Sequence, residues 1–515
     1  MLGVAAGALA VLAVTAAQET ASAAPVAPAA AAQPVVKLSS SPLGMNIPPW
    51  DALYANTGSG NILQRYLKNA DVTQLHYGGG QYSDEFDWQT DSSIQNCPTT
   101  AVSEYKAKCA IYNALYFNLF SKKARAIKAQ SFVTVNYGSG TPAEAAAEVK
   151  QSKKAGDQVA QWEIGNEGYG CWEDNNWLAG APEDYKGYNP KATLVGGNNP
   201  TCPMIKEGSV NAGMEIMAKS YAANAAKFMS AMKAVNRSAD IGVPYAFDNS
   251  VGGASVGGNT VWNNTVLSAD RKYIGFVDLH WYPESYGGTT GAAGNPTAQQ
   301  VIQSVYQIPA VAAKVRASLR ANRLPNAKMV VGETGVSYLA TNTACTAVGA
   351  LFAAGDALEW LTQGASTVDW WQLSGYGNTG TTCSKADEGM FTSNNKPVPE
   401  SPYIGYLLTG SLAQPGAKLT KLTLTPAADS SSVLAFQSVL PTGKSDVLLI
   451  NTSTSASMSV KFRSALGGKL SKVLYAGGNQ NAFGTRTTTT TTSAAAVAKG
   501  IVLPAESITL LKNVS

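Results

Sequence analysis

The feature that most constrains the fold is an alternation of short apolar runs with long alanine-rich amphipathic stretches between Leu43 and Pro399. Alternating strands and helices are typical of βα units, and eight such units favour a closed parallel barrel over an open sheet. The expected strands span residues 44–47, 72–77, 132–137, 161–164, 241–246, 276–281, 329–332 and 368–373. The clearest helical stretches span 142–154, 213–235, 298–321 and 344–363. We therefore predict an α/β fold with a (β/α)8 TIM barrel over residues 43–399.

The sequence after Pro399 has a different texture. Helical periodicity fades, and short alternating strands follow one another between Gly, Ser and Thr turns, which is typical of a β-sandwich. The expected strands span 418–424, 433–438, 446–451, 457–462, 470–475 and 501–511. We predict a β-sandwich domain over residues 400–515. It contains no tryptophan, so we expect a structural partner of the barrel, and we expect the threonine run 487–492 to be an exposed loop.

The first residues of the chain have the composition of an export signal. Residues 1–17 are apolar and rich in Ala, Leu and Val, and Ala21-Ser22-Ala23 fits a cleavage site. A membrane anchor is the alternative, but the run is short for a bilayer. We predict a signal peptide over 1–23 and an Ala/Pro-rich tether over 24–42. With no second apolar span, the mature protein is expected to be soluble and secreted.

Charge and cysteine content limit the partners. A net charge of +4 over 515 residues gives no reason to expect nucleic acid or an anionic membrane as partner, and the oligomeric state stays open. The six cysteines of an exported protein usually pair, and near neighbours in sequence are the expected pairs, although six cysteines allow fifteen arrangements. The expected pairs are Cys97 with Cys109, Cys171 with Cys202, and Cys345 with Cys383. Only two histidines accompany them, so we expect no metal, and nothing calls for a cofactor.

Two glutamates follow expected strands in well-separated units. Hydrolysis of a glycosidic bond with retention needs two carboxyls about 5 to 5.5 Å apart, and on a parallel barrel they sit at the C-terminal ends of strands. Glu167 ends the segment WEIGNE at 162–167, whose alternation points Glu163 into the barrel. Glu333 follows an apolar strand and has glycines on both sides. The alternatives are a solvated loop glutamate for Glu167 and a helix-capping carboxylate for Glu333.

Further candidates lie on the expected sixth strand and among the tryptophans. Alternation along 276–283 places Asp278, His280 and Tyr282 on one face. A tyrosine hydroxyl donating to a carboxylate would keep it ionised, while His280 fits structural support and substrate contact equally well. All ten tryptophans fall between Trp50 and Trp371, and indole rings suit the apolar faces of sugars. Trp88 and Trp371 are candidate sugar contacts, although each tryptophan alone fits a core role.

Three segments resemble the family 51 α-L-arabinofuranosidases of glycoside hydrolase clan A, whose catalytic glutamates lie on barrel strands four and seven. They are LHYGGGQY at 75–82, TVNYGSGTP at 134–142 and WEIGNE at 162–167, and the resemblance covers roughly residues 43–377. It implies that Glu167 is the acid/base, that Glu333 is the nucleophile, and that Asn166 holds the sugar's 2-hydroxyl. It also implies that Tyr282 donates to Glu333.

One position departs from that family. Where the family typically has an arginine that supports the nucleophile, this chain has His76, which leaves the charge beside Glu333 and the detailed subsite open. We expect a secreted retaining glycoside hydrolase that acts on plant or microbial oligo- or polysaccharides, with α-L-arabinofuranosides as first substrate class. The alternatives are a β-glycosidase, β-glucuronidase or endo-glycanase of the same clan, and a non-catalytic carbohydrate-binding protein on a lapsed enzyme barrel.

Overall fold

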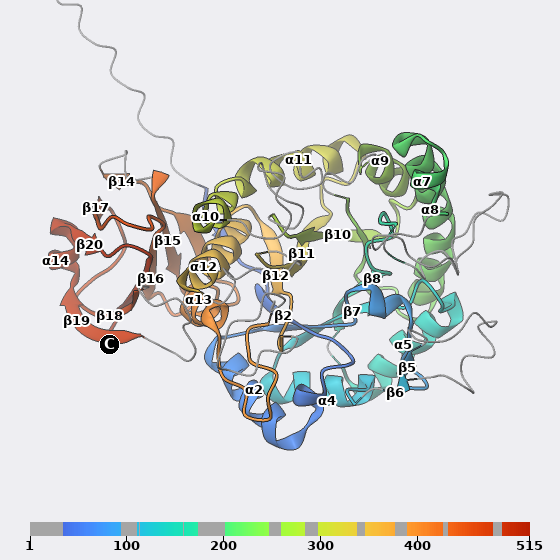
Figure 1. The fold of residues 1–515 in the computed structure, drawn as a ribbon, viewed down its shortest axis with the longest axis horizontal. Helices are drawn as coiled ribbons and strands as arrows, with labels where there is room; N and C mark the ends of the chain where they lie inside the picture. The colour runs from blue at the N-terminus through green and yellow to red at the C-terminus, as the bar shows by residue number, and fades with distance from the viewer. Residues whose placement is uncertain are drawn as a thin grey trace, which may run out of the picture. The chain divides into compact units, whose positions relative to one another are not determined.

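Eight parallel strands close into a barrel in the computed structural model of the chain (Figure 1). The described residues are 34–93, 111–112, 114–157, 159–171, 173, 201–246, 259–283, 297–336, 346–375, 389–425, 431–476 and 487–514. In chain order the barrel strands are β2 (Leu43–Ile47), β3 (Gln74–Tyr77), β7 (Gln130–Val135), β8 (Val159–Ile164), β9 (Ile241–Pro244), β10 (Ile274–Trp281), β11 (Lys328–Thr334) and β12 (Ala365–Trp370). Each pairs in parallel with the next, and β12 pairs with β2 to close the ring. The eight expected strands are confirmed.

Helices between the strands cover the outside of the barrel. They are α1 (Ala52–Ala55), α2 (Thr57–Asn69), α4 (Phe117–Ile127), α5 (Pro142–Ala155), α7 (Pro203–Lys206), α8 (Val210–Val235), α9 (Asn259–Ala269), α10 (Ala298–Val305), α11 (Ile308–Ala321), α12 (Ala347–Thr362) and α13 (Ser401–Gly410). A typical start is that of α5, where the Thr141 side chain accepts from the amide of Glu144 and Pro142 occupies the first turn. Helix α12 is buried along its whole length and packs against α13.

The barrel interior is divided into an apolar and a polar part. Phe132, Phe276 and Val330 form a small buried cluster of their own, separate from the large core between strands and helices. Further along the same strands the inward positions are polar and buried, including Thr134 on β7 and Asp278 on β10. Since side chains alternate along a strand, the two kinds of layer follow directly from the sequence order.

The C-terminal region consists of antiparallel sheets. A seven-stranded sheet runs in the order β1 (Val36–Lys37), β13 (Lys418–Lys421), β15 (Val433–Val439), β16 (Ser445–Asn451), β21 (Ser507–Asn513), β18 (Lys469–Ala476) and β19 (Thr488–Ser493). A three-stranded sheet contains β14 (Leu424–Thr425), β17 (Met458–Phe462) and β20 (Ile501–Leu503), and α14 (Ala494–Lys499) lies between β19 and β20 in sequence. Strands from both sheets contribute to one buried apolar cluster, which is the packing of a sandwich.

Two features of this region were not expected. Val36–Lys37, inside the stretch expected to be a tether, forms β1 and pairs with β13. The expectation of a loop at 487–492 was wrong, because most of that run forms β19, which pairs with β18 along its length. Threonine is β-branched and suits a strand, and hydrogen bonding to β18 decides the conformation although the side chains stay exposed.

A third, smaller antiparallel sheet joins β4 (Phe86–Asp87), β5 (Ser92–Ser93) and β6 (Ile111–Tyr112). Among the described residues, no helix has the length and apolar character needed to cross a membrane.

Candidate active site

Glu167 is positioned by a sharp backbone turn after β8, the fourth barrel strand. Gly165 has φ 70° and Glu167 itself has φ 38°, a left-handed conformation that non-glycine residues rarely adopt. A Cβ on Gly165 would lie 2.6 Å from Cβ of Tyr137, so the close approach requires glycine. The buried carboxylate of Asp84 fixes the turn by accepting the amide of Asn166 at 3.2 Å. Backbone strain of this kind persists where the surroundings enforce it, commonly at functional sites.

Glu333 lies near the end of β11, the seventh barrel strand, and both its carboxylate oxygens accept hydrogen bonds. The hydroxyl of Tyr282 donates to Oε2 at 2.8 Å, as the resemblance implied. The amide of Gly80 donates to Oε1 at 2.9 Å. Gly78, Gly79 and Gly80 all have positive φ, which turns this loop so that an amide faces the carboxylate. The two donors hold Glu333 in one orientation and favour its ionised form.

His280 connects the two glutamates. Its Nδ1 lies 2.9 Å from Oε1 of Glu167 and 3.5 Å from Oε2 of Glu333. These two carboxylate oxygens are therefore at most about 6.4 Å apart. In the β10–β11 register His280 pairs directly with Glu333, after a shift between Leu279 and His280. The geometry is that of a close carboxyl pair with a histidine alongside.

The charges of the site are strongly coupled. Burial alone would lower the pKa of His280, but Glu333, Asp278 and Glu167 outweigh it and hold that pKa well above its ordinary value. Burial raises the pKa of Glu333 to about 7, with Glu167 adding to the rise, while His280, Gly80 and Tyr282 oppose it. His280 therefore supplies the positive charge beside Glu333.

Beneath this pair lies a buried polar layer. His76 is fully buried, with Nδ1 3.1 Å from the carbonyl oxygen of Gly332 and Nε2 2.7 Å from Oγ1 of Thr134. Oγ1 of Thr134 is in turn 2.9 Å from Oε2 of Glu163. The Gly332 amide donates to Oδ1 of Asp278 at 2.7 Å. One hydrogen-bond network thus joins β8 and β11, the strands that lead to the two candidate catalytic glutamates.

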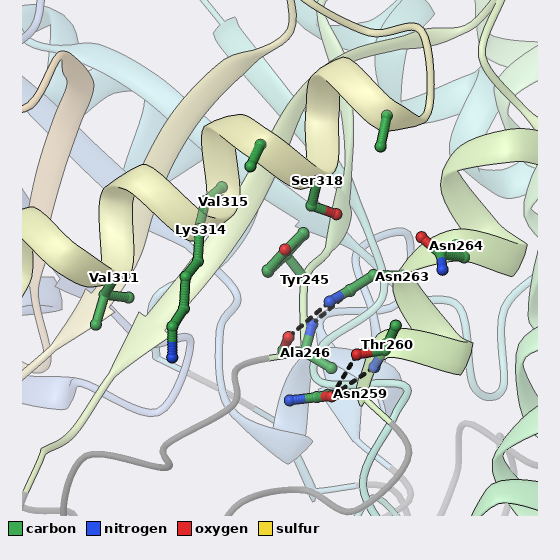
Figure 2. A pocket seen from close by; sticks show the side chains of 12 residues that line it. Tyr245, Ala246, Asn259, Thr260, Asn263, Asn264, Val311, Lys314, Val315 and Ser318 are labelled. Carbon is green, nitrogen blue, oxygen red and sulfur yellow. Dashed lines mark hydrogen bonds between the residues drawn. The ribbon is translucent and has the colours of Figure 1, made fainter.

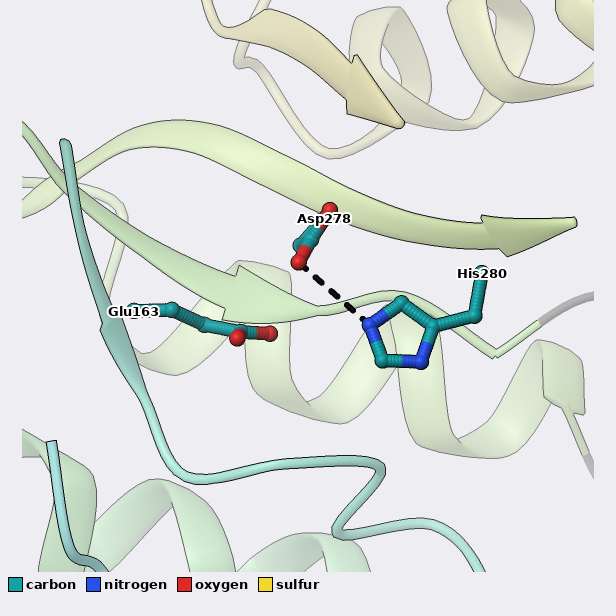
Figure 3. Close-up of side chains that lie close together, drawn as sticks. All are labelled: Glu163, Asp278 and His280. Atoms are coloured by element: carbon teal, nitrogen blue, oxygen red, sulfur yellow. Dashed lines mark ion pairs between the residues drawn. The ribbon is translucent and has the colours of Figure 1, made fainter. Parts of the chain in front are cut away.

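Glu163, Asp278 and His280 are the described residues that could hold a metal ion (Figure 3). One potential ligand atom from each lies within 4.8 Å of the others, and all three residues are buried. His280 Nε2 and Asp278 Oδ2 form an ion pair at 3.4 Å, which Figure 3 marks. Two carboxylates and one imidazole are hard or borderline ligands of the kind that zinc accepts, but a structural zinc site normally has four protein ligands, and this group supplies three.

The remaining predicted residues occupy different places. Asn166 is buried next to Glu167, and its Nδ2 donates to Oε1 of Glu173 at 3.0 Å. Trp371 follows β12, and its ring lies against the glycine loop, since a Cβ on Gly79 would be 2.9 Å from it. The described contacts of Trp88 are with other residues: its Nε1 donates to the carbonyl of Glu144 at 3.3 Å, and its ring lies against that of Phe117. His76, with no exposed surface, lies behind the pair rather than in contact with solvent.

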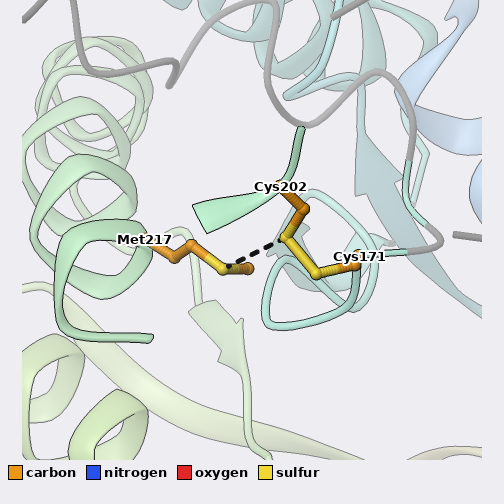
Figure 4. The surroundings of a disulfide bond; sticks show 3 residues. All are labelled: Cys171, Cys202 and Met217. Atoms are coloured by element: carbon orange, nitrogen blue, oxygen red, sulfur yellow. Dashed lines mark hydrogen bonds between the residues drawn. A yellow bond between two sulfur atoms is a disulfide. The ribbon is translucent and has the colours of Figure 1, made fainter. Parts of the chain in front are cut away.

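One expected disulfide is present and two lie outside the described residues. Cys171, four residues after Glu167, is bonded to Cys202, and Sγ of Cys202 lies 3.7 Å from Sδ of Met217 on α8 (Figure 4). The bond ties the segment after β8 to the start of α7. The expected pairs Cys97–Cys109 and Cys345–Cys383 fall on residues outside the description.

A cavity of about 350 Å³ lies between α9, α11 and the residues that follow β9 (Figure 2). Its lining includes Tyr245, Asn259, Asn263, Lys314 and Ser318. None of the predicted site residues lines it, so it is separate from the carboxyl pair.

Sequence reasoning missed several groups that shape the site. Tyr169 donates its hydroxyl to Oε1 of Glu167 at 3.2 Å, and its position two residues after the glutamate was a usable signal. The Gly80 amide and the Asp84 carboxylate act from a loop whose conformation no periodicity reveals. Glu173, the partner of Asn166, likewise follows no strand pattern.

Comparisons with known proteins place the fold. No protein-family model matches the chain, and no curated protein matches it in sequence. Solved structures do match in three dimensions over nearly all of the chain. The α-L-arabinofuranosidase of Thermotoga maritima is 15% identical, with 93% of this chain and 98% of that chain covered and a TM-score of 0.65. The fold of this chain is similar to that of this arabinofuranosidase.

Two further structures show the range of the similarity. The GH51 α-L-arabinofuranosidase of Thermotoga petrophila is 16% identical, over 94% of this chain and 98% of that chain, with a TM-score of 0.66. The 4-O-α-L-rhamnosyl-β-D-glucuronidase of Fusarium oxysporum is 15% identical, with 95% of this chain and 99% of that chain covered and a TM-score of 0.59. At these identities the likeness establishes the barrel and the C-terminal sheets, and the expected fold class is confirmed.

Proposed function

We propose that the chain is a retaining O-glycosyl hydrolase in which Glu167 is the acid/base and Glu333 is the nucleophile. The observation that carries the proposal is the pairing of these glutamates through His280, at most about 6.4 Å between oxygens, at the C-terminal ends of strands four and seven. The side chain of Glu167 is 19% exposed and that of Glu333 is 6% exposed, so Glu167 is the more accessible to a leaving group and to water.

The mechanism follows from these positions. Glu333, oriented by Tyr282 and Gly80, attacks the anomeric carbon while Glu167 gives its proton to the leaving oxygen. The result is a glycosyl ester on Glu333 and a free alcohol. Glu167 then removes a proton from water, whose oxygen attacks the anomeric carbon and releases Glu333. Glu333 and Glu167 supply the nucleophile and the proton of the first step, and water supplies the nucleophile of the second step and restores the proton of Glu167.

The proposed substrate is a neutral glycoside, with α-L-arabinofuranosides as the first class to test. Among the described residues of the site the positive group is His280, and it is engaged by three carboxylates, so an anionic sugar has no side-chain cation there. Five of the similar structures are named as arabinofuranosidases. The glucuronidase, xyloglucanase and xylanase among them keep a β-glycosidase or endo-glycanase as the second candidate.

We also propose that the protein is secreted. The Cys171–Cys202 disulfide supports this, since such bonds persist in oxidising compartments. The expected signal peptide at 1–23 lies outside the described residues. Mass spectrometry of the protein from culture medium tests both points, because cleavage after Ala23 gives one expected mass.

The deciding experiment measures nitrophenol release from aryl glycosides by the wild type, by Glu333→Gln and by a control variant. The control is Glu215→Gln, at an exposed position of α8. We expect release by the wild type and the control, and a loss of about a thousandfold or more in Glu333→Gln with an unchanged circular dichroism spectrum. A 2-fluoro glycoside should trap a glycosyl ester on Glu333, found by peptide mass spectrometry. Substantial activity in Glu333→Gln would refute the assignment.

The substrate panel separates the remaining candidates. Release from the α-L-arabinofuranoside alone supports the first class, while release from a β-xyloside, β-glucoside or β-glucuronide keeps the mechanism and changes the substrate. Activity on polysaccharide without release from the panel identifies an endo-glycanase. Inactivity on all of these would favour the carbohydrate-binding alternative.

A further inference from the structure

His76, Thr134 and Glu163 form a row of hydrogen-bonded side chains inside the barrel, called the interior chain below. The distances between these groups determine how many hydrogens they share. A carbonyl oxygen only accepts, so the 3.1 Å contact between His76 Nδ1 and the Gly332 carbonyl places a hydrogen on Nδ1. Oγ1 of Thr134 lies 2.7 Å from His76 Nε2 and 2.9 Å from Oε2 of Glu163. One hydroxyl hydrogen serves only one of these two contacts.

An ionised Glu163 beside a neutral His76 therefore does not fit. One contact would bring two lone pairs together at less than 3 Å, in a buried place where a polar group without a hydrogen bond has a high free-energy cost. These three hydrogen-bonded side chains must therefore hold one additional hydrogen, either on Nε2 of His76 or on Glu163. The first choice makes an imidazolium and a carboxylate, and the second leaves all three groups neutral.

The surroundings decide between the two. The ionisable and polar groups that face Glu163 are Asp278 and His280 on β10, Glu333 on β11 and Thr134 on β7. Burial is the largest effect on Glu163 and the charge of Asp278 the second, and together they raise its pKa well above the ordinary value. Burial, with a smaller contribution from nearby His280, lowers the pKa of His76 to about 4 against the opposing effects of Asp278 and the Gly332 carbonyl. Both effects favour the neutral arrangement.

We propose that Glu163 is a neutral acid in the working protein and that the interior chain positions the nucleophile. Glu163 donates to Thr134, Thr134 donates to Nε2 of His76, and His76 donates through Nδ1 to the Gly332 carbonyl. Gly332 immediately precedes Glu333, and Asn46 also donates to this carbonyl at 2.7 Å. The chain of donors joins strands β8, β7 and β3 to the strand that carries Glu333.

This arrangement has an electrostatic consequence. A carboxylate at Glu163 would add a negative charge near Glu333 and oppose its ionisation. The neutral acid removes that charge while keeping the hydrogen bonds. These uncharged hydrogen-bonded groups therefore include the position where the family that this chain resembles has an arginine, and His280, 3.5 Å from Glu333, supplies the positive charge.

The test uses two isosteric variants and a matched control. Glu163→Gln replaces a neutral acid by a neutral amide that still donates to Thr134, while Thr134→Val removes the central hydroxyl. The control Glu215→Gln removes an exposed acid on α8, outside the interior chain, and should leave the protonated-carboxyl band unchanged. The first readout is the infrared spectrum at neutral pH, where the wild type should show a protonated-carboxyl C=O band that Glu163→Gln selectively reduces. This readout needs no activity, so it stands even if the proposed function fails.

The second readout is kcat/KM against pH. We expect Glu163→Gln to stay within about threefold of the wild type with the acid limb at the same pH, and Thr134→Val to lose about tenfold or more. A shift of the acid limb to lower pH in Glu163→Gln would mean that a negative charge had been removed, and would overturn the proposal. A stoichiometric metal in the purified protein that Glu163→Gln loses would overturn it as well.

Discussion

Replacing Tyr282 by phenylalanine removes the hydroxyl that donates to Oε2 of Glu333 at 2.8 Å. A hydrogen bond to a charged group contributes about 1.5 to 3 kcal/mol. Because the bond favours the carboxylate, its loss should raise the pKa of Glu333, from about 7, by about one to two units. The fraction of Glu333 that is ionised at neutral pH falls accordingly, and the ionised form is the nucleophile.

The assay is kcat/KM for the aryl glycoside over a pH series. The acid limb of the Tyr282→Phe profile should move to higher pH by the same one to two pH units, with a loss of about 5- to 50-fold at pH 7 and about 10- to 100-fold well below it. Tyr406→Phe is the matched control, because its hydroxyl donates to the buried carbonyl of Val368 at 3.1 Å, away from the pair. An acid limb that stays in place in Tyr282→Phe, or moves equally in both variants, would refute the reasoning.

Three further predictions concern stability. Replacing Cys171 and Cys202 together by serine opens a loop with a sequence separation of 31 and should cost about 4 kcal/mol, seen as a lower Tm; a Tm that reductant lowers equally in wild type and variant would contradict this. Gly332→Ala places a Cβ 2.2 Å from a buried carboxylate oxygen and should lose about 1 to 3 kcal/mol in urea unfolding, whereas Gly467→Ala, with no neighbour within 4 Å, should lose little. The folded protein keeps a proton on Glu163 that the unfolded protein releases above pH 4.5. The free energy of unfolding of the wild type, relative to that of Glu163→Gln, should therefore fall by about 1.4 kcal/mol for each pH unit above 4.5. A difference that does not change with pH would show that Glu163 is ionised in the folded protein.

The barrel and its carboxyl pair were accessible to sequence reasoning because both depend on local order along the chain. Alternation of apolar residues marks a strand, and a single glutamate at its end marks the edge where parallel strands open. Glu167 and Glu333 satisfy that pattern, and their strands are the fourth and seventh of the closed barrel.

The surroundings of the pair depend on contacts between distant segments. Alternation indicates the face on which His76 lies, but its depth beneath Glu333 follows from the curvature of the closed barrel. The Gly80 amide reaches Glu333 across 253 positions of sequence, through a loop of three positive-φ glycines. The threonine run became a strand because β18 was free to pair with it, which composition alone does not reveal.

Strand β1 precedes the barrel in sequence but pairs with β13, in the sheet that follows the barrel, and this affects folding during synthesis. Val36 pairs with Leu419, so an early segment leaving the ribosome waits for almost four hundred residues before its sheet exists. A truncation that treats residues 34–42 as dispensable linker would uncover the backbone edge of β13. Such an edge can template pairing between molecules, so a trimmed protein should aggregate even though its barrel is intact. The segment ahead of the barrel thus protects the far end of the chain.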